Sequence, residues 1–448
     1  MPAIERDLAG LVGPEQVLPG TTSTYLSDAT ESRGVRGHAD AVVLPRTAEE
    51  VAAVIAWCSG RGVAVVPRGG GTGLAGGCVP AGGIVLCTER LVRVRSFDPL
   101  LWRTEVEAGV RTGDVHRRAR ENGLAFPPDP GAAEQSHIGG NVATNAGGPH
   151  AFKYGVTGQW VTGLEAVLPS GELVRVGGPV RKDVAGYDLR GLLVGSEGTL
   201  GVITSVWLRL LPAPEATLPV VAFYPDAETG CAAVEAVIGS GIVPAALEYL
   251  DGGTLAIAAP AYPGAVPGGA AFAVLAEADG SAAEAERVRA ELLDVLGDGA
   301  LGVQAPEPAP LWRWRDGLSL AVRGHVGAKV SEDIVVPLDR LADAIRGTHE
   351  IGARHDLEAV SWGHAGDGNL HSSFLVATGD GAALERAERA AGDLFALARE
   401  LGGTVSGEHG LGTLKRGQAG WPPPVAAAQR AIKAAFDPKG LMNPGKKL

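Results

Sequence analysis

The residues of this chain best suited to chemistry stand in one short stretch, WGHAGDGNLHSSF, at positions 362–374. Its two histidines, His364 and His371, lie at equal distances from the central segment GDGN at 366–369. Gly and Asn adopt positive φ at low cost, so this segment predicts the turn of a β-hairpin. In that hairpin His364 would face His371, with Cβ atoms about 5 Å apart. Neutral imidazole is a common metal ligand, so the spacing suggests a metal site; an exposed hairpin without a ligand is the alternative.

The elements around the hairpin are predicted from hydrophobic periodicity and capping signals. DIVVP, LDRLADAI and EAVSWGHAGDG indicate a strand, a helix and a strand, and a long helix follows up to Gly402. Before them, AFAVLAEAD indicates a strand. SAAEAERVRAELLDVL indicates an amphipathic helix opened by a capping box of Ser281 and Glu284. Strands and helices therefore alternate through the second half of the chain.

The first half of the chain is rich in predicted strands. Residues 41–66 indicate strand, helix and strand, with a capping box of Thr47 and Glu50 at the start of the helix. GGIVLCT, RTEVEAGV, GLEAVLPSGELVRV and TLGVITSVWLRLLP continue the β pattern. The stretch PAPEATLP at 212–219 interrupts that pattern, so we place a domain boundary there.

Composition and charge exclude several classes of protein. With 448 residues, 45% of them hydrophobic and 20% charged, the chain has room for two or three globular domains. The net charge of −12 argues against a nucleic-acid partner. No apolar run approaches the roughly 18 residues of a membrane span, and no secretory signal pattern is visible. The four cysteines have no CxxC spacing and suggest a reducing compartment, so we expect a cytoplasmic protein.

Glycine is the unusual residue of this sequence, with 66 positions that cluster in a few strips. The first strip, PRGGGTGLAGG at 67–77, contains G-x-G-x-x-G after a predicted strand. Another strand follows it instead of a helix, which argues against a Rossmann dinucleotide site. Exposed N–H groups of such a loop could cradle a pyrophosphate, and a glycine loop without a ligand is the alternative.

Two further strips lie in the same half of the chain. The second, at 127–148, combines Gly and Ala with Ser136, Asn141, Thr144 and Asn145, whose side chains offer hydrogen bonds. The third, GSEGTLG at 195–201, precedes a strand. Three strips in one β-rich domain favour one long cofactor over three separate turns.

Taken together, these motifs resemble a known family. PRGGGTGLAGG, PPDPGA, GGNVATNAGG, the pair YG at 154–155 and KDVAGYDLRGLLVGSEGTLGVIT are similar to the FAD-binding domain of the vanillyl-alcohol oxidase/PCMH superfamily. KVSEDIVVP, GHAGDGNLH, SGEHGLG and FDPKGLMNPGKKL resemble the FAD-linked D-2-hydroxyacid dehydrogenases. That group includes D-lactate dehydrogenase, D-2-hydroxyglutarate dehydrogenase and the flavoprotein subunit of glycolate oxidase. The motifs follow the expected order over about residues 38–448.

The resemblance implies an α+β fold. It would consist of a PCMH-type FAD-binding domain of two α+β subdomains and a cap domain with an antiparallel sheet covered by helices. We assign the FAD-binding domain to residues 1–213 and the substrate and cap domain, with the metal site, to 214–414. Residues 415–448 are expected to return to the FAD-binding domain.

The resemblance also implies a cofactor site. In this family the first strip wraps the FAD pyrophosphate, the second lines the flavin and ribityl chain, and the third lies near the adenine half. Some superfamily members attach FAD through a histidine of the first loop; here that loop has Thr72 and neither His nor Cys, so we expect non-covalent FAD. The implied residues are Arg68, Gly69, Gly70, Gly71, Thr72, Gly73, Leu74, Pro130, Gly131, Ser136, Gly139, Asn141, Thr144, Gly148, Glu197, Gly201 and Ile203.

For the two histidines the resemblance implies a catalytic metal centre. The family's ligands fall on His364, His371 and Glu408, with Zn²⁺ the expected ion. Two imidazoles and a carboxylate leave positions open, as in catalytic zinc sites, and a 2-hydroxy acid could fill them. The metal would act as a Lewis acid on the substrate hydroxyl. His409 matches the family's general base, and the C2 hydride would move to flavin N5.

Substrate carboxylate contacts of the family fall on Arg315, Ser319 and Lys329. For the first two, WRWRDGLSL is equally compatible with a surface helix, and Arg313 competes with Arg315. Some relatives carry a polar amide two residues after the second histidine, where this chain has Ser373. The substrate of no single relative is therefore carried over.

The implied activity is oxidation of a D-2-hydroxy acid to the 2-oxo acid by an FAD-dependent dehydrogenase. One alternative is an FAD-linked oxidase of another hydroxy or sugar acid that uses O₂. Another is an electron-relaying flavoprotein subunit of a larger complex, although such subunits usually lack the histidine hairpin and SGEHG. Alkyl transfer is disfavoured because its run of consecutive histidines is absent. The expected acceptor is a quinone, a cytochrome or an electron-transfer flavoprotein; a homodimer and peripheral membrane association through the acceptor are left open.

Overall fold

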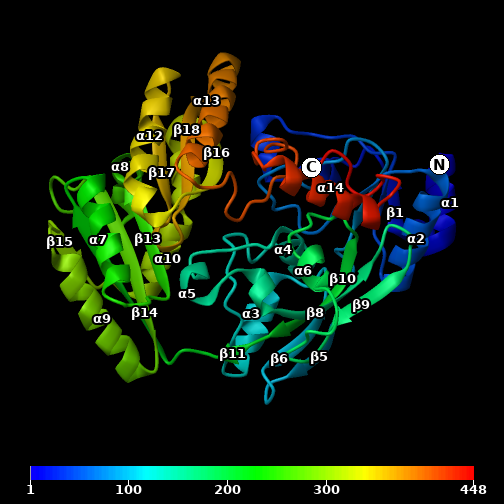
Figure 1. Cartoon of the computed structure of the whole chain (residues 1–448), viewed down its shortest axis with the longest axis horizontal. Coiled ribbons are helices and arrows are strands. Elements are labelled where there is room, and N and C mark those ends of the chain that lie inside the picture. The colour runs from blue at the N-terminus through cyan, green and yellow to red at the C-terminus, as the bar shows by residue number, and fades with distance from the viewer. Residues whose placement is uncertain (1) are drawn as a thin grey trace. The chain divides into compact units, whose positions relative to one another are not determined.

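The computed structural model describes residues 2–448, which form two compact units. The first unit contains the chain up to Gly147, Val156–Pro212 and Glu408–Leu448, and the second contains Gly148–Gly155 and Ala213–Gly407. The boundaries proposed from the sequence lie after residues 213 and 414, and the units divide after Pro212 and after Gly407. Both units combine helices with sheets, as Figure 1 shows, which confirms the predicted α+β class.

The first unit contains a four-stranded sheet in the order β1 (Val17–Pro19), β2 (Ala41–Val43), β4 (Ile84–Cys87) and β3 (Val65–Arg68). Strands β2, β4 and β3 are parallel, and α2 (Ala48–Arg61) connects β2 to β3. The side chain of Thr47 accepts a hydrogen bond from the Glu50 N–H at 3.2 Å, which confirms the predicted N-terminal cap. The predicted strand, helix and strand over 41–66 are therefore confirmed.

The second sheet of this unit has five antiparallel strands. Their order is β5 (Val94–Asp98), β6 (Arg103–Glu107), β10 (Val202–Arg209), β8 (Val161–Val167) and β9 (Leu173–Gly177). The second glycine strip contains a short helix, α4 (Ile138–Thr144), which the sequence did not predict. The other α-helices and strands of this unit are α1 (Ala3–Val12), α3 (Thr112–Glu121), β7 (Leu124–Ala125), α6 (Leu189–Leu193), β11 (Leu211–Pro212) and α14 (Pro423–Phe436).

The second unit contains a seven-stranded antiparallel sheet. Its order is β15 (Gly302–Gln304), β12 (Ala216–Tyr224), β14 (Phe272–Gly280), β13 (Ala246–Asp251), β17 (Ala359–His364), β18 (Asn369–Ala377) and β16 (Gly327–Val335). Strand β12 begins at Ala216, so the interruption predicted over 212–219 is shorter than expected.

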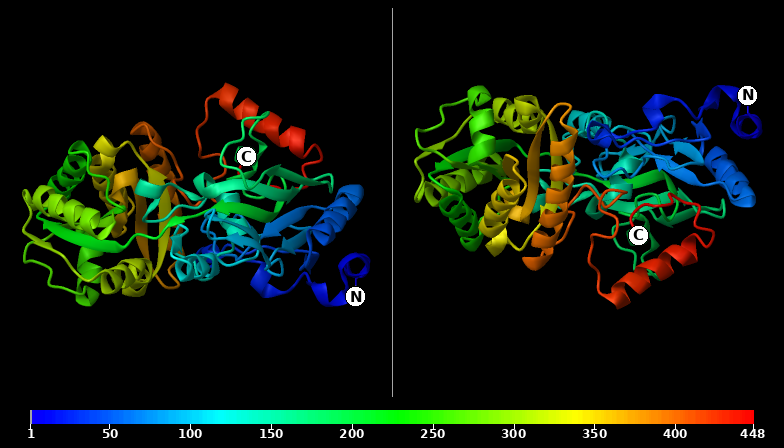
Figure 2. Two further views of the ribbon diagram at one scale, coloured as in Figure 1. Left: turned by 90° about the horizontal axis from the view of Figure 1, so that it is seen from below. Right: turned by 90° about the horizontal axis from the view of Figure 1, so that it is seen from above.

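Helices cover both faces of this sheet (Figure 2). One face carries α7 (Ala227–Gly239), α9 (Ala282–Gly297), α12 (Leu341–Arg354) and α13 (Gly381–Glu400); the other carries α8 (Gly252–Ala258), α10 (Pro308–Asp316) and α11 (Leu318–Val326). Successive residues of β12 show the alternation: the Tyr224 hydroxyl donates to the Leu296 carbonyl of α9, whereas Phe223 packs in the cluster that contains Leu311 of α10. The predicted antiparallel sheet covered by helices is confirmed.

The histidine hairpin forms, but its predicted register is wrong. His364 pairs with Asn369, and His371 pairs with Trp362. A 3₁₀ turn at Ala365–Asp367 followed by Gly368 at φ +65° makes the loop, so Asn369 is already the first residue of β18. His371 lies two residues beyond Asn369 and therefore on the same face as His364. The two histidines are diagonal neighbours, within reach of each other although not directly opposed.

Candidate metal and substrate site

The two histidine side chains meet on the face of the sheet that α8, α10 and α11 cover. Their Nε2 atoms lie 3.4 Å apart, and the rings stand nearly perpendicular at 87°. Both are buried, with 4% and 8% of the residue exposed. Glu408, directly after the last residue of the second unit, completes a group whose three potential ligand atoms lie within 4.8 Å of one another. This donor set of two imidazoles and one carboxylate fits a divalent cation.

A buried carboxylate on β13 orients His364. The Oε1 atom of Glu248 lies 2.5 Å from Nδ1 of His364. Its Oε2 atom accepts hydrogen bonds from the Arg315 guanidinium, with Nε at 2.8 Å. Burial opposes ionisation of Glu248, but the charge of Arg315 and the hydrogen bonds with His364 and Arg315 outweigh it and lower the pKa of the carboxyl. An ionised Glu248 accepts the proton of Nδ1, which leaves the lone pair of a neutral His364 on Nε2, the atom that faces His371.

A second buried carboxylate, Asp333 of β16, fixes the backbone before Glu408. Its Oδ1 atom accepts from the Asn369 amide at 2.6 Å, and its Oδ2 atom accepts from the Ser406 hydroxyl and the Gly407 N–H, both at 2.9 Å. Asp333 thus ties the first residue of β18 to the segment that leads into Glu408. Asp333 is fully buried, so these bonds form in a poorly solvated environment where they are strong.

Sequence reasoning missed Glu248 and Asp333. Both belong to strands, and an acidic residue is rare in a strand interior. All six residues of β13 are buried, so Glu248 is surrounded by apolar neighbours in ALEYLD. A carboxylate among apolar strand residues is almost never buried without a partner. An acidic residue in an otherwise apolar strand was therefore the sequence feature that could have indicated a buried, partnered carboxylate.

The predicted substrate-binding residues are placed in two groups. Lys329 of β16 donates to the Ser319 hydroxyl of α11 at 3.0 Å, and its ammonium lies 4.4 Å from the centre of the Trp362 ring. Burial, with a smaller effect from the charge of Arg323, lowers the pKa of Lys329 to about 7. Arg315 instead lies against Glu248, with Nη2 at 3.4 Å from Nδ1 of His364.

Arg313 and Ser373 also bear on how a substrate would be bound. Arg313 is exposed, whereas Arg315 on the same helix is buried and points toward Glu248, which favours Arg315 as the site residue. The helix is therefore not a surface helix at this position. Ser373 is fully buried and donates to the Ser331 hydroxyl at 2.8 Å.

In the first unit, the three glycine strips pack against one another. A Cβ added at Gly70 would come within 2.3 Å of the Gln135 carbonyl, and one at Gly198 within 3.0 Å of the Pro67 ring. Gly71 and Gly76 have φ of +71° and +73°, which other residues rarely adopt. The first strip is a loop between β3 and β4, as predicted, and leaves backbone without side chains along it. Backbone of this kind fits an extended phosphate-containing cofactor.

Several polar side chains of the implied FAD site serve the loops themselves. Arg68 donates to the carbonyls of Ser27 at 2.6 Å and Thr24 at 2.9 Å. Thr112 accepts from the Asn141 amide at 2.6 Å and lies 2.9 Å from the Ser136 hydroxyl. Because these side chains form hydrogen bonds within the protein, backbone groups are the main contacts that the strips offer to a cofactor.

The other implied FAD residues are placed as follows. Thr144 donates to the Gly140 carbonyl, and Glu197 accepts from the N–H groups of Leu411 at 3.0 Å and Gly412 at 2.6 Å. Gly131 has open space where a Cβ would be, and Ile203 is buried in β10. A Cβ added at Gly139 would come within 2.5 Å of the Ala108 side chain, and one at Gly201 within 2.8 Å of the Val167 carbonyl.

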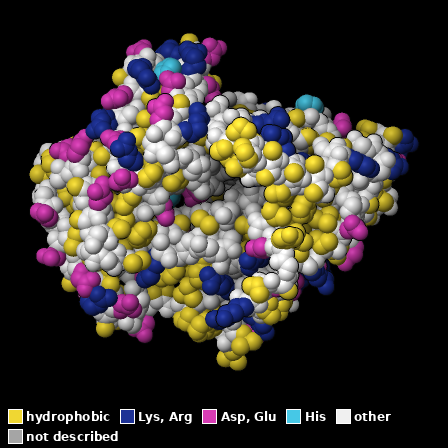
Figure 3. All heavy atoms as spheres, viewed as in Figure 1, with side chains coloured by type: hydrophobic (Ala, Val, Ile, Leu, Met, Phe, Trp, Pro, Cys, Tyr) yellow, Lys and Arg dark blue, Asp and Glu magenta, His cyan; other side chains and the backbone are white. Residues whose placement is uncertain are grey.

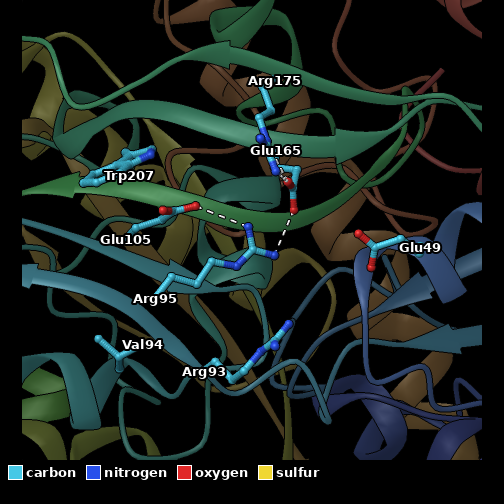
Figure 4. A pocket seen from close by; sticks show the side chains of 8 residues that line it. All are labelled: Glu49, Arg93, Val94, Arg95, Glu105, Glu165, Arg175 and Trp207. Carbon is cyan, nitrogen blue, oxygen red and sulfur yellow. Dashed lines mark hydrogen bonds and ion pairs between the residues drawn. The ribbon is translucent and has the colours of Figure 1, made fainter.

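A cavity of about 850 Å³ in the first unit is lined by none of the predicted site residues. Figure 4 shows Arg95 at its centre, donating to Glu105 at 3.2 Å and to Glu165 at 2.9 Å. Arg175 donates to the other oxygen of Glu165, at 2.9 Å. The charges of this cavity neutralise one another across the sheet β5-β6-β10-β8-β9, so we assign it a structural role. No helix within residues 2–448 is both long and apolar enough to cross a bilayer.

Comparisons with known proteins agree with this arrangement. Residues 213–447 match the family model described as FAD linked oxidases, C-terminal domain, and residues 39–177 match the FAD binding domain model. The chain is 37% identical over 454 residues to the glycolate oxidase subunit GlcD of Bacillus subtilis (strain 168), covering 99% of this chain and 96% of that protein. It is 33% identical over 455 residues to a D-lactate dehydrogenase of Anaerostipes hadrus, with 97% and 95% covered.

Solved structures show the same fold. A crystal structure of p-cresol methylhydroxylase with substrate bound is similar with a TM-score of 0.84, 17% sequence identity, and coverage of 99% of this chain and 96% of that chain. At that level of identity the likeness concerns the fold alone.

Proposed function

This chain belongs to the family of FAD-linked oxidases and is an oxidoreductase that binds FAD, and we propose that it oxidises a D-2-hydroxy acid to the 2-oxo acid. The observation that carries the proposal is the set of two buried imidazoles, His364 and His371, with Glu408 beside them and Glu248 behind His364. A flavoprotein that only relayed electrons would have no need of an oriented imidazole pair in its cap.

The glycine strips would hold FAD through backbone N–H groups of residues 69–74, and the bound flavin supplies the two-electron acceptor for a hydride from C2 of the substrate. We propose that FAD is bound non-covalently, because the first loop contains neither His nor Cys. The nearest thiol in the sequence, Cys78, accepts a hydrogen bond from Arg68, and burial raises its pKa to about 11. Acid precipitation should release the yellow colour into the supernatant; flavin retained in the pellet would contradict this.

His364, His371 and Glu408 would hold one divalent metal, with Zn²⁺ the best fit to the donor set; when bound, it supplies a Lewis acid for the substrate hydroxyl. Glu248 keeps Nε2 of His364 available as a ligand atom. Lys329 and Ser319 would bind the substrate carboxylate, and Arg315 would add positive charge beside His364. His409 would take the hydroxyl proton on a ring nitrogen, since a neutral imidazole has one nitrogen that accepts a proton.

The test is anaerobic mixing of the holoenzyme with D- and L-lactate, D-2-hydroxyglutarate and glycolate while flavin absorbance near about 450 nm is followed. Bleaching by one or more D-2-hydroxy acids is expected, and absence of bleaching by every acid would refute the proposal. In His409→Asn, FAD and metal should stay while bleaching slows by about 10²- to 10⁴-fold. Bleaching at the wild-type rate would show that His409 is not the base.

The electron acceptor is the second part of the proposal. The Bacillus subtilis relative is named a glycolate oxidase subunit, which suggests that a partner chain takes part in that enzyme. We propose a catalytic chain that passes electrons to a separate acceptor, a quinone, a cytochrome or an electron-transfer flavoprotein. A direct oxidase would instead consume O₂ in proportion to substrate, which an oxygen electrode distinguishes.

A further inference from the structure

The loop between β5 and β6 in the first unit exposes an apolar tip. Leu100 and Leu101 are 89% and 53% exposed, and Trp102 is 38% exposed. The Asp98 side chain accepts from the Leu101 N–H at 3.1 Å, and Trp102 has φ +53°, so the loop has a defined conformation. Single exposed apolar side chains are ordinary, but three in a row at a hairpin end are not.

A groove of about 390 Å³ lies beside this tip and is lined by arginines. Arg103, Arg181 and Arg209 contribute the charge, and Val180, 50% exposed, extends the apolar rim. Of the part of the chain that the structure describes, no Asp or Glu side chain lines the groove. Arg103 pairs with Asp98 at 3.5 Å, whereas no carboxylate among the described side chains forms an ion pair with Arg181 or Arg209.

Each of these arginines lies near a tryptophan ring. The guanidinium carbon is 5.5 Å from the ring centre for Arg181 and Trp102, 4.4 Å for Arg209 and Trp160, and 5.9 Å for Arg103 and Trp207. Burial, together with the charge of Arg181, lowers the pKa of Arg209. The groove therefore gathers positive charge on aromatic surface without a matching negative charge of its own.

The combination of protruding apolar side chains, tryptophan and arginine is the chemistry of the boundary between lipid headgroups and acyl chains. Hydrophobic and Lys/Arg side chains lie together at the lower edge of Figure 3, over the part of Figure 1 where β5 and β6 are labelled. The net charge of −12 works against general adsorption to an anionic membrane, so any binding must depend on a local cationic surface. A soluble anion would account for the arginines but not for the exposed leucines.

We propose that this tip and groove seat the protein on an anionic lipid bilayer. Leu100, Leu101 and Trp102 enter the headgroup–acyl boundary, and Arg181 and Arg209 contact lipid phosphates. The inference does not depend on the substrate or the metal, because all of these residues belong to the first unit and none is assigned to catalysis.

Flotation of the FAD-loaded full chain with vesicles tests the inference. Vesicles of phosphatidylcholine with about one third phosphatidylglycerol should bind the protein at least about tenfold more strongly than pure phosphatidylcholine, because each arginine adds attraction to anionic lipid. The double variant Leu100→Asp/Leu101→Asp and the single variant Arg181→Gln should each lose about tenfold in partitioning.

Leu301→Asp provides the matched control, since Leu301 is 44% exposed in the second unit and should have no effect. Bound FAD and circular dichroism show that each variant is folded. Wild-type protein that fails to float, or that floats equally with both vesicle types, overturns the proposal. Equal vesicle binding by the wild type and the tip variants also overturns the proposal. That result would leave an acidic protein as the partner of the arginine-lined groove. Loss of flotation in inorganic phosphate at constant ionic strength would assign the groove to a free anion.

Discussion

At the scale of single residues, Glu248 lies against Nδ1 of His364 and so leaves Nε2 as the nitrogen that would bind the proposed metal. It also holds Arg315, so one carboxylate neutralises a guanidinium and fixes an imidazole. Such partners of ligand histidines are often as important as the ligands, because they set the tautomer and the ring orientation. The site would thus depend on a residue that touches neither metal nor substrate.

Glu248→Gln should therefore weaken metal binding by about 10- to 100-fold. The amide keeps the shape of the side chain but removes the charge that holds the Nδ1 proton. Competition with a chelator of known affinity measures the change. Glu277→Gln is the control, since Glu277 is also a buried strand carboxylate of this sheet, 3.0 Å from His150. An equal effect in both variants would mean that buried charge in general, and not the His364 contact, supports the metal.

Lys329 should make substrate binding depend on pH. Its pKa is lowered to about 7, so below that pH it carries the charge that a carboxylate requires, and above it the free protein must first take up a proton. The dissociation constant of the 2-oxo acid product should hence rise up to about tenfold per pH unit above pH ~7. Titrations of the oxidised enzyme between about pH 6 and pH 9 measure this. The Lys329→Met variant should bind the 2-oxo acid more weakly, and its dissociation constant should not vary with pH in this range. An unchanged pH profile in the variant would assign the pH dependence to another group.

At the scale of elements, the β17–β18 turn determines whether the two imidazoles meet. Gly368 has φ +65°, and a Cβ there would lie 2.1 Å from the Val336 carbonyl. The chain can turn at this point only because that space is empty. A turn one residue longer or shorter would place His371 on the opposite face of the sheet, since side chains alternate along a strand.

Gly368→Ala should lower thermal stability and reduce metal content. Positive φ costs alanine roughly 1–2 kcal/mol, and the clash with Val336 displaces the hairpin in addition. Gly379→Ala is the matched control, because Gly379 has φ +84° but open space around its Cβ position. We expect a loss of stability in both and a loss of metal in Gly368→Ala alone, by calorimetry and metal analysis. Full metal content in Gly368→Ala would show that the turn tolerates displacement.

At the scale of the whole molecule, most of the proposed FAD contacts and the two histidines proposed to bind the metal belong to different compact units. The glycine strips up to Gly147 and the proposed ligand Glu408 belong to the first unit, and the histidine pair belongs to the second. A ligand that binds only the folded state stabilises it, by about 2.7 kcal/mol at a concentration of 100 times its dissociation constant. Removal of each ligand should consequently act first on the strands and loops that carry its proposed contacts.

Removal of the metal by a chelator should raise hydrogen exchange in β16, β17 and β18 and leave β3 and β4 protected. Removal of FAD should have the converse effect on the loops that follow β3. Exchange measured by mass spectrometry on peptides of each unit provides the readout. A common rise in both units after either treatment would mean that they unfold as one cooperative body, and the separate assignment would be wrong.

The sequence alone determined the local features. Periodicity and capping residues predicted α2, α9 and the strands beside them because these signals act within one helical turn or a few strand residues. The motif set predicted the FAD-linked family and the antiparallel sheet with its helices. The symmetry of the two histidines predicted that their imidazoles converge, which the 3.4 Å approach of the Nε2 atoms confirms.

Only the tertiary structure decided what surrounds those histidines. The register of the hairpin depends on how Gly368 fits against Val336, a contact that spacing does not encode. Glu248 lies 116 residues from His364 in the chain, and Asp333 lies 74 residues from Gly407, so no local pattern links either carboxylate to the residue it holds. A buried carboxylate is stable only beside the donors that the fold supplies, and those donors are known only once the strands are paired.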